Sequence, residues 1–187
     1  QETNYPSEGI KGTISNCDLA VICNINFARP MLDLAQKAGK WIATDVHALA
    51  DINDKYNQDY MHAARVLFIS SDRLWDHPQA VAQQLMKRFG NEIIVVGMGS
   101  QGALLLTRHG IPRAFPAVFT RPVVNTIGAG DALFSCFIHE FARHGDPEKA
   151  LPRAIIFASY KIGEVGAADG FLSAPELDSW DEQLHNI

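Results

Sequence analysis

The chain has 187 residues, of which 47% are hydrophobic, and this is enough apolar material for one sizeable core and for a single domain over residues 1–187. The formal net charge is −5 and the basic residues form no block, so the composition argues against a nucleic-acid partner and against binding to a membrane. Three scattered cysteines and the lack of any apolar run long enough for a membrane span favour a cytoplasmic protein.

Strand-like and helix-like segments alternate along the first half of the chain, a pattern typical of a doubly wound, mostly parallel sheet with helices on both faces. Glycines at positions 39 and 90 are placed to end two of the helices. In this half we expect buried strands at residues 19–23, 41–44, 66–69 and 92–96, and helices at residues 30–38 and 78–89.

A polar stretch follows the second of these strands, from residue 45 to residue 59. In open α/β sheets, ligands bind beyond the carboxyl ends of the strands, so Asp45 and His47 are candidates for contacting a substrate. Taken singly, each of them is more often part of a hydrated turn.

A glycine-rich segment, residues 97–102, matches G-x-G-x-x-G after a strand. A dinucleotide-binding fold of the NAD-linked dehydrogenase type is the obvious alternative, but residues 103–107 resemble a strand rather than a helix. No acidic residue occurs between Ile93 and Gly130, so this stretch lacks the carboxylate that would hold a ribose hydroxyl in such a fold. We therefore interpret the glycines as positions where the backbone can approach a ligand closely.

Three arginines are the only charged residues in that acid-free stretch. They favour a positive potential near a bound anion, although the solvent face of a β-hairpin is the better explanation for the first two. They are Arg108, Arg113 and Arg121.

The sequence N-T-I-G-A-G-D at residues 125–131 precedes a strongly apolar helix. Small residues leave the amides of the first helical turn bare, and these amides together with the helix dipole predict an anion site. Asp131, directly after the glycines, is placed to accept a proton from an attacking hydroxyl. The combination indicates phosphoryl transfer.

Three helices are expected in the last third of the chain. The apolar helix after Asp131 runs to about His144 and ends at Gly145. The next helix, over residues 150–164, follows Asp146 as its cap, and Ser173 with Glu176 has capping-box spacing for a terminal helix reaching residue 185.

Residues 125–131 resemble the D-T-x-G-A-G-D signature of ribokinase-like (PfkB-type) carbohydrate kinases, with Asn125 in place of the first Asp. Residues 97–102 resemble the family's T-x-G-x-x-G loop, with Gly97 in place of Thr. The resemblance implies transfer of the γ-phosphate of ATP to a hydroxyl of a sugar or sugar-like acceptor. It gives Asp131 the role of catalytic base and makes Gly128, Ala129 and Gly130 the anion hole.

The resemblance also implies binding sites for ATP, Mg²⁺ and a monovalent cation. The family's N-x-x-E motif for magnesium is absent after residues 66–69, where the chain reads S-S-D-R and offers Asp72 as a stand-in. Asn125 and Gly166 lie where many relatives hold a monovalent cation. The residues expected to bind ATP are Gly99, Ser100, Gly102, Thr126 and Ile155.

Members of the family are usually about twice as long as this chain, which predicts the C-terminal, nucleotide-binding portion of a longer kinase without the first strands and the lid. Residues 1–12 would then be the tail of that lid or a return from it. The expected partner is a small sugar, and a homodimer is compatible with the sequence. Two alternatives stay open: a nucleoside or vitamin-precursor kinase of the same superfamily, and a catalytically silent kinase-like interaction protein.

Overall fold

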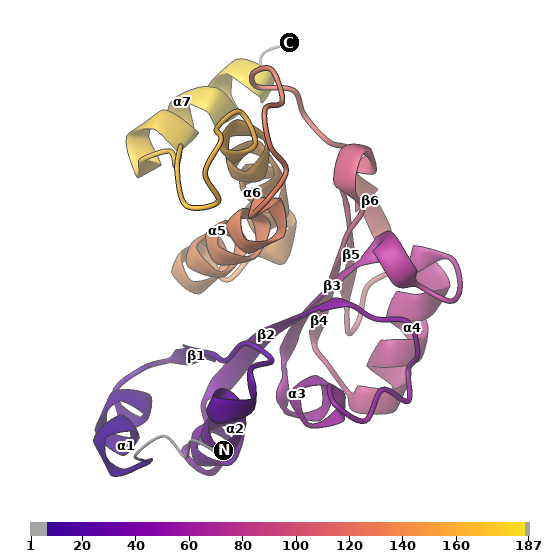
Figure 1. Ribbon diagram of the computed structural model, residues 1–187, viewed down its shortest axis with the longest axis vertical. Helices are drawn as coiled ribbons and strands as arrows, with labels where there is room; N and C mark the ends of the chain where they lie inside the picture. Colours follow the sequence, from indigo (N-terminus) through magenta and orange to yellow (C-terminus); the bar gives the residue numbers. More distant parts are fainter. Residues whose placement is uncertain (1–6, 186–187) are drawn as a thin grey trace. The chain divides into compact units, whose positions relative to one another are not determined.

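The computed structural model describes residues 7–185 as an α/β protein (Figure 1). Its six strands follow one another in the sheet in the order β1-β2-β3-β4-β5-β6. The pairs β1–β2 and β2–β3 are parallel and the pair β5–β6 is antiparallel, so the expected α/β fold with a mostly parallel sheet is confirmed. The strands are β1 (Leu19–Val21), β2 (Trp41–Ala48), β3 (Val66–Ser70), β4 (Ile93–Gly97), β5 (Ala103–Thr107) and β6 (Arg113–Phe115).

The chain divides into two compact units. Residues up to 96 together with 106–112 form the first unit, and residues 97–105 together with those from 113 onward form the second. No helix of residues 7–185 is both long enough and apolar enough to cross a bilayer. The first unit holds α1 (Ser7–Ser15), α2 (Arg29–Lys37), α3 (Gln58–Ala63) and α4 (Pro78–Phe89), and the second holds α5 (Ala129–His144), α6 (Pro147–Lys161) and α7 (Ala174–His185).

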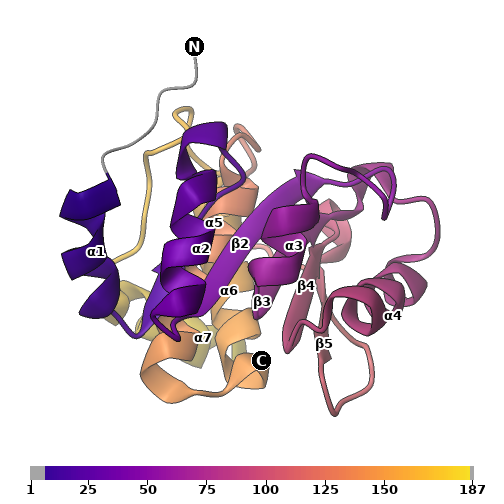
Figure 2. The same cartoon turned by 90° about the horizontal axis from the view of Figure 1, so that it is seen from below.

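Parallel strands that are neighbours in both sequence and sheet organise the first unit. Right-handed crossovers between such strands place their connecting helices on the same face, and α2 and α3 both pack on β2 (Figure 2). The apolar residues of β3 and β4 are almost completely buried. The core of the unit includes Ile42, Val46, Tyr60, Met61, Leu67, Val81, Leu85 and Ile94.

The strand expected to be buried at residues 19–23 is instead a short, partly exposed edge strand. β1 spans only three residues, and Val21 is 51% exposed. The expectation was wrong because an apolar run indicates burial only if neighbours cover the strand, and β1 pairs with β2 at the end of the strand order.

β2 is longer than the sequence predicted and runs to Ala48, so Asp45 lies inside the strand rather than at its end. The register between β2 and β3 shifts between Asp45 and Ala48, and His47 has a left-handed φ of 58°. Pairing with β3 resumes at Ala48 after this irregularity. The short helix α3 begins at Gln58, at the end of the polar stretch, where the sequence pattern predicted only a loop.

Most of the predicted helix ends are confirmed. Gly90 and Gly145 follow α4 and α5 in the left-handed conformation, with φ values of 76° and 68°. Asp146 caps α6 by accepting hydrogen bonds from the N–H groups of Glu148 and Lys149. At α7, the Ser173 N–H and hydroxyl both donate to Glu176 Oε2, and these bonds lower the pKa of the Glu176 carboxyl.

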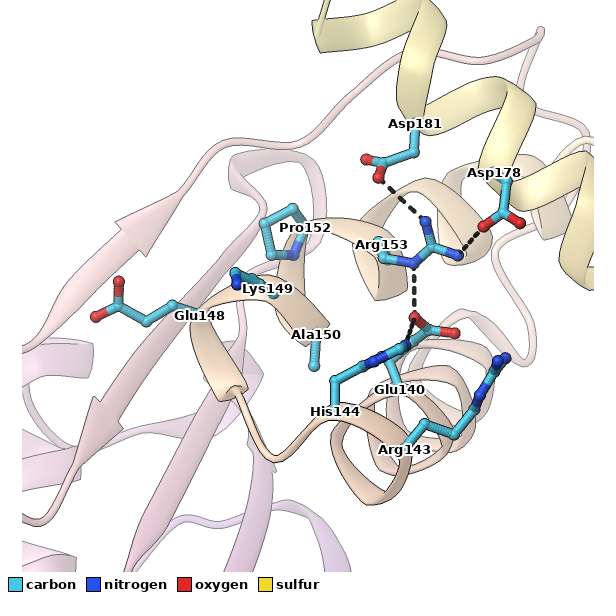
Figure 3. Close-up of a pocket in the computed structure, with 10 residues that line it drawn as sticks. All are labelled: Glu140, Arg143, His144, Glu148, Lys149, Ala150, Pro152, Arg153, Asp178 and Asp181. Carbon is cyan, nitrogen blue, oxygen red and sulfur yellow. Dashed lines mark hydrogen bonds and ion pairs between the residues drawn. The ribbon is translucent and has the colours of Figure 1, made fainter.

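An ion-pair network joins the three helices of the second unit (Figure 3). The Glu140 side chain of α5 is 2% exposed, and its Oε2 accepts a hydrogen bond from Arg153 Nε of α6 at 2.6 Å. The same guanidinium donates to Asp178 at 2.5 Å and to Asp181 at 3.1 Å, both on α7. Burial acts to lower the pKa of Arg153, but the bond to Asp178 and the charge of Glu140 raise it overall. One arginine therefore compensates a buried carboxylate and holds α7.

We expect Arg153→Ala to lower the free energy of unfolding by about 3–5 kcal/mol, because it leaves the Glu140 carboxylate buried without its cation. The matched control is Arg113→Ala, which also removes an arginine from an ion pair, here between β6 and α6. The Arg113–Glu148 pair has side chains that are 60% and 56% exposed, so this change should cost about 1 kcal/mol or less. Urea unfolding of both variants makes the comparison, and equal losses would contradict the role given to Arg153.

Candidate active site

The N-terminus of α5 is open. The helix begins at Ala129, and its first internal hydrogen bond runs from the Ala132 N–H to the Gly128 carbonyl at 2.9 Å. The amides of Gly130 and Asp131 therefore have no acceptor within the helix. Gly130 is exposed, and a Cβ built on it would meet nothing within 4 Å. Bare amides at the positive end of a 16-residue helix are suited to bind an anion.

Asp131 lies in the first turn of α5 and is exposed, whereas the next three residues are buried. The helix thus turns its apolar side into the unit and leaves this carboxylate accessible. A group that approached the bare amides would meet the Asp131 side chain within the same turn. This is the arrangement that general-base chemistry next to an anion site requires.

Gly128 is fixed by its surroundings as well as by its own backbone. Its φ is +80°, and a Cβ at this position would lie 2.6 Å from the Ala167 carbonyl oxygen. The carbonyl of Thr126, which is exposed, accepts a hydrogen bond from the Ala129 N–H at 3.1 Å. The turn that opens α5 is therefore packed against the loop that follows α6.

Asn125 ties these two loops together. Its Nδ2 donates to the Val165 carbonyl at 2.7 Å, its Oδ1 accepts from the Ile127 N–H at 3.0 Å, and its own N–H donates to the Ile162 carbonyl at 3.0 Å. Asn125 thus contacts the carbonyl of the residue directly before Gly166. A Cβ on Gly166 would lie 2.0 Å from Asp169 Oδ2.

Lys161 is a site residue that the sequence pattern did not reveal. It is the last residue of α6, its side chain is fully buried, and its Nζ donates to the Ile127 carbonyl. A lysine in the last turn of an apolar helix usually extends to solvent, so the sequence gives little signal for this contact. The partner carbonyl lies 34 positions away in the chain.

The glycine-rich segment forms a short 3-10 turn, η3 (Gly99–Gln101), between β4 and β5. Gly99 has a φ of +56° with open space around it, and Ser100 is exposed, so both can approach a ligand. Gly102 is buried, with a φ of +94° and room for no Cβ, which would lie 2.0 Å from the Phe115 carbonyl oxygen. Close packing against β6 is sufficient to explain this glycine.

Ile155 lines a small apolar cavity in the second unit. The cavity has a volume of about 180 Å³, and Ile155 itself is 6% exposed. Flat, apolar groups such as a nucleobase are suited to such surroundings. The lining residues are Phe115, Pro116, Val118, Pro152, Ile155, Ile156 and Leu184.

Asp45, His47 and Asp72 lie in the first unit, whereas Asp131 lies in the second. Asp45 is 7% exposed, and its Oδ1 accepts a hydrogen bond from the His47 N–H at 2.8 Å. Asp72 is exposed and its N–H donates to Ser70 Oγ. Residues 7–185 contain no cluster of three acidic, histidine or cysteine side chains that could hold a metal. Mg²⁺ bound to nucleotide phosphates needs only one or two carboxylates from the protein.

Two of the three arginines of the acid-free stretch form close ion pairs with glutamates. Arg113 pairs with Glu148 at 2.6 Å and Arg121 with Glu164 at 2.9 Å. Arg108 donates to the Gly90 carbonyl and lies 3.8 Å from Glu92. Glu148 and Glu164 thus offset the charges of Arg113 and Arg121, so the expectation that these two arginines make the anion site positive loses its support.

The larger of the two described cavities of the second unit, about 520 Å³, lies far from the open helix N-terminus. Charged side chains line it, among them Glu140 and Arg153 (Figure 3). Glu140 follows Gly130 by ten residues in α5, which corresponds to roughly 15 Å along the helix axis. We therefore place the candidate active site at the N-terminus of α5 and not at this cavity.

Comparison with known proteins identifies the family to which the chain belongs. The family model of the pfkB family carbohydrate kinases matches residues 33–174. A deoxyribokinase of Salmonella typhi is 34% identical over 110 residues, covering 59% of this chain and 34% of the relative. A 1-phosphofructokinase of Haloferax volcanii is 32% identical over 143 residues, covering 72% of this chain and 45% of the relative.

Solved structures show the same fold. The microbiome-derived acarbose kinase Mak1 has a TM-score of 0.87 at 25% identity, over 95% of this chain and 60% of that one. A ribokinase from Thermotoga maritima has a TM-score of 0.77 at 18% identity, and the match covers 92% of this chain and 59% of that one. The chain spans 34% to 45% of the length of the two curated relatives. Because the family model spans most of the chain, the chain belongs to the pfkB family of carbohydrate kinases.

Proposed function

We propose that this protein transfers the γ-phosphate of ATP to a hydroxyl group of a sugar or sugar-like acceptor. The observation that best supports this is the open N-terminus of α5, with an exposed carboxylate in its first turn. Phosphoryl transfer depends mainly on alignment of the reactants and on stabilisation of negative charge, and an open helix N-terminus supplies both.

Asp131 is the base in this proposal and accepts the proton of the attacking hydroxyl. The amides at the start of α5 stabilise charge on the transferred phosphoryl group. The Ala129 N–H already donates to the Thr126 carbonyl, so the Gly130 and Asp131 amides, which lack helical acceptors, contribute most. Gly128 supplies the turn that aims these amides.

ATP is proposed to lie along Gly99 and Ser100 and near Thr126, all of which are exposed. Ile155 and the apolar cavity that it lines are suited to the base. We assign Gly102 an indirect part, because packing against β6 already requires a glycine there. Mg²⁺ would accompany the nucleotide and neutralise phosphate charge, with Asp72 as the proposed protein ligand.

A sugar or sugar phosphate is the acceptor that the relatives favour, since they include a deoxyribokinase and a 1-phosphofructokinase. Asp45 and His47 are proposed to contact it. A nucleoside is the main alternative, because the same base and amides would serve any alcohol. A catalytically silent interaction protein is less well supported, since the exposed Asp131 and the open amides are features that such a protein does not need.

Asp131→Asn should lower kcat on the order of 10²- to 10⁴-fold, because the amide cannot accept the proton of the acceptor hydroxyl. Asp131 is exposed, so the fold and the affinity for ATP should be retained. The measurement is ADP formation with Mg²⁺ over a panel of sugars, sugar phosphates and nucleosides, together with ATP binding by calorimetry.

The matched control is His139→Gln, a change at an exposed residue two turns further along α5. It should leave turnover as in the wild type. Full turnover by Asp131→Asn with intact ATP binding would show that the carboxylate is not the base. ATP binding by the wild type without ADP formation from any acceptor would favour the silent alternative.

Gly128→Ala should destabilise the protein by about 3 kcal/mol or more, through backbone strain at a φ of +80° and the clash with the Ala167 carbonyl. Gly145→Ala is the control, since Gly145 has a similar φ of +68° at the other end of α5 and a Cβ there would meet no atom within 4 Å. Gly145→Ala should therefore lower the free energy of unfolding by about 1 kcal/mol. Urea unfolding measures both, and similar losses would mean that the Ala167 contact does not constrain the turn.

A further inference from the structure

The buried ammonium group of Lys161 is the feature from which this inference starts. The side chain is 0% exposed, and Nζ donates to the Ile127 carbonyl, directly before Gly128. Within residues 7–185 no carboxylate forms an ion pair with Lys161, although burying an uncompensated charge is expensive. The groups that compensate the ammonium charge of Lys161 are backbone carbonyls and the negative end of the α6 dipole.

A second donor closes the same pair of loops. Asn125 Nδ2 donates to the Val165 carbonyl at 2.7 Å, while its Oδ1 accepts from the Ile127 N–H. Charged groups in the surrounding elements are occupied or exposed: Glu164 pairs with Arg121, and Asp169 is at the surface. Lys161 and Asn125 therefore supply N–H donors to two carbonyls of these loops.

The family resemblance implies a monovalent cation at Asn125 and Gly166, and this can be tested against the residues present. A potassium ion is held by oxygen atoms, typically backbone carbonyls, that replace its hydration shell. Here the Ile127 carbonyl already accepts from an ammonium, and the Val165 carbonyl accepts from an amide N–H. An ammonium and an amide N–H group that already donate to these carbonyls do not fit a bound cation.

We propose that Lys161, assisted by Asn125, takes the place of the monovalent cation as a built-in positive charge. The ammonium holds the Ile127 carbonyl and so fixes the turn at Gly128 that aims the α5 amides. Lys161 is a positioning residue that acts through Ile127, and its effect on turnover rests on the kinase activity proposed above. The protein should consequently be indifferent to potassium.

The first test compares KCl, NH₄Cl, NaCl and choline chloride at equal ionic strength on the full-length wild type. Thermal unfolding temperature and the rate of ADP formation should not depend on which cation is present. A potassium-induced rise of about 3 °C in Tm, or of tenfold in kcat, would overturn the proposal.

The second test uses the double variant Asn125→Asp/Lys161→Met, which removes both donors and restores an acidic ligand while conserving side-chain length. In choline chloride kcat should fall about 10- to 100-fold with a nearly unchanged KM for ATP, and KCl or NH₄Cl should restore most of it and raise Tm by about 3 °C. Lys149→Met, at an 81% exposed lysine of the same helix, should behave as the wild type.

A double variant that folds but ignores every cation would refute the assignment. If the double variant does not fold in any salt, the wild type decides: indifference of both its Tm and its rate supports the built-in charge, and a potassium response overturns it. The Tm series does not require turnover, so a protein without ADP formation would refute the kinase proposal while the role of Lys161 is still tested.

Discussion

The structure around the candidate site depends on one constraint: the start of α5 cannot be capped by its own side chains and also stay open to an anion. Its N-cap is Gly128, which has no side chain to offer, whereas Asp146 at α6 occupies two first-turn amides. The missing stabilisation comes from the loop after α6 instead. The N–H groups of Val124 and Asn125 both donate to the Ile162 carbonyl, at 2.8 and 3.0 Å, and Gly128 packs on Ala167.

The same constraint determines where the positive potential at the N-terminus of α5 comes from. Arg113 and Arg121 form ion pairs with Glu148 and Glu164, so they connect elements of the second unit rather than bind phosphate. In the proposed reaction, positive potential must then come from backbone amides, the α5 dipole and the metal that accompanies ATP. Oriented amides cost little reorganisation during the reaction, because the packing of the loops already fixes them.

Features that depend on a few neighbouring residues could be predicted from the sequence. The end of α4 at Gly90, the cap at Asp146 and the capping box at Ser173 and Glu176 are of this kind, and all are confirmed. Features that depend on distant partners could not. The exposure of β1 depends on its place at the edge, and the length of β2 depends on its irregular pairing with β3. The six residues of α3 are too few to show a helical period.

The two glycine-rich stretches show why a motif has to be judged by the secondary structure into which it leads. Residues 97–102 lead into the strand β5, so they offer single amides and an exposed turn but no helix dipole, and Gly102 is already required by the backbone of Phe115. Residues 125–131 lead into the 16 residues of α5, so the same small side chains there expose aligned amides. An anion that develops charge during a reaction is stabilised more by aligned amides than by an isolated turn. The phosphoryl group therefore belongs at α5 in the proposed reaction, and the first stretch is left to contact the rest of the nucleotide.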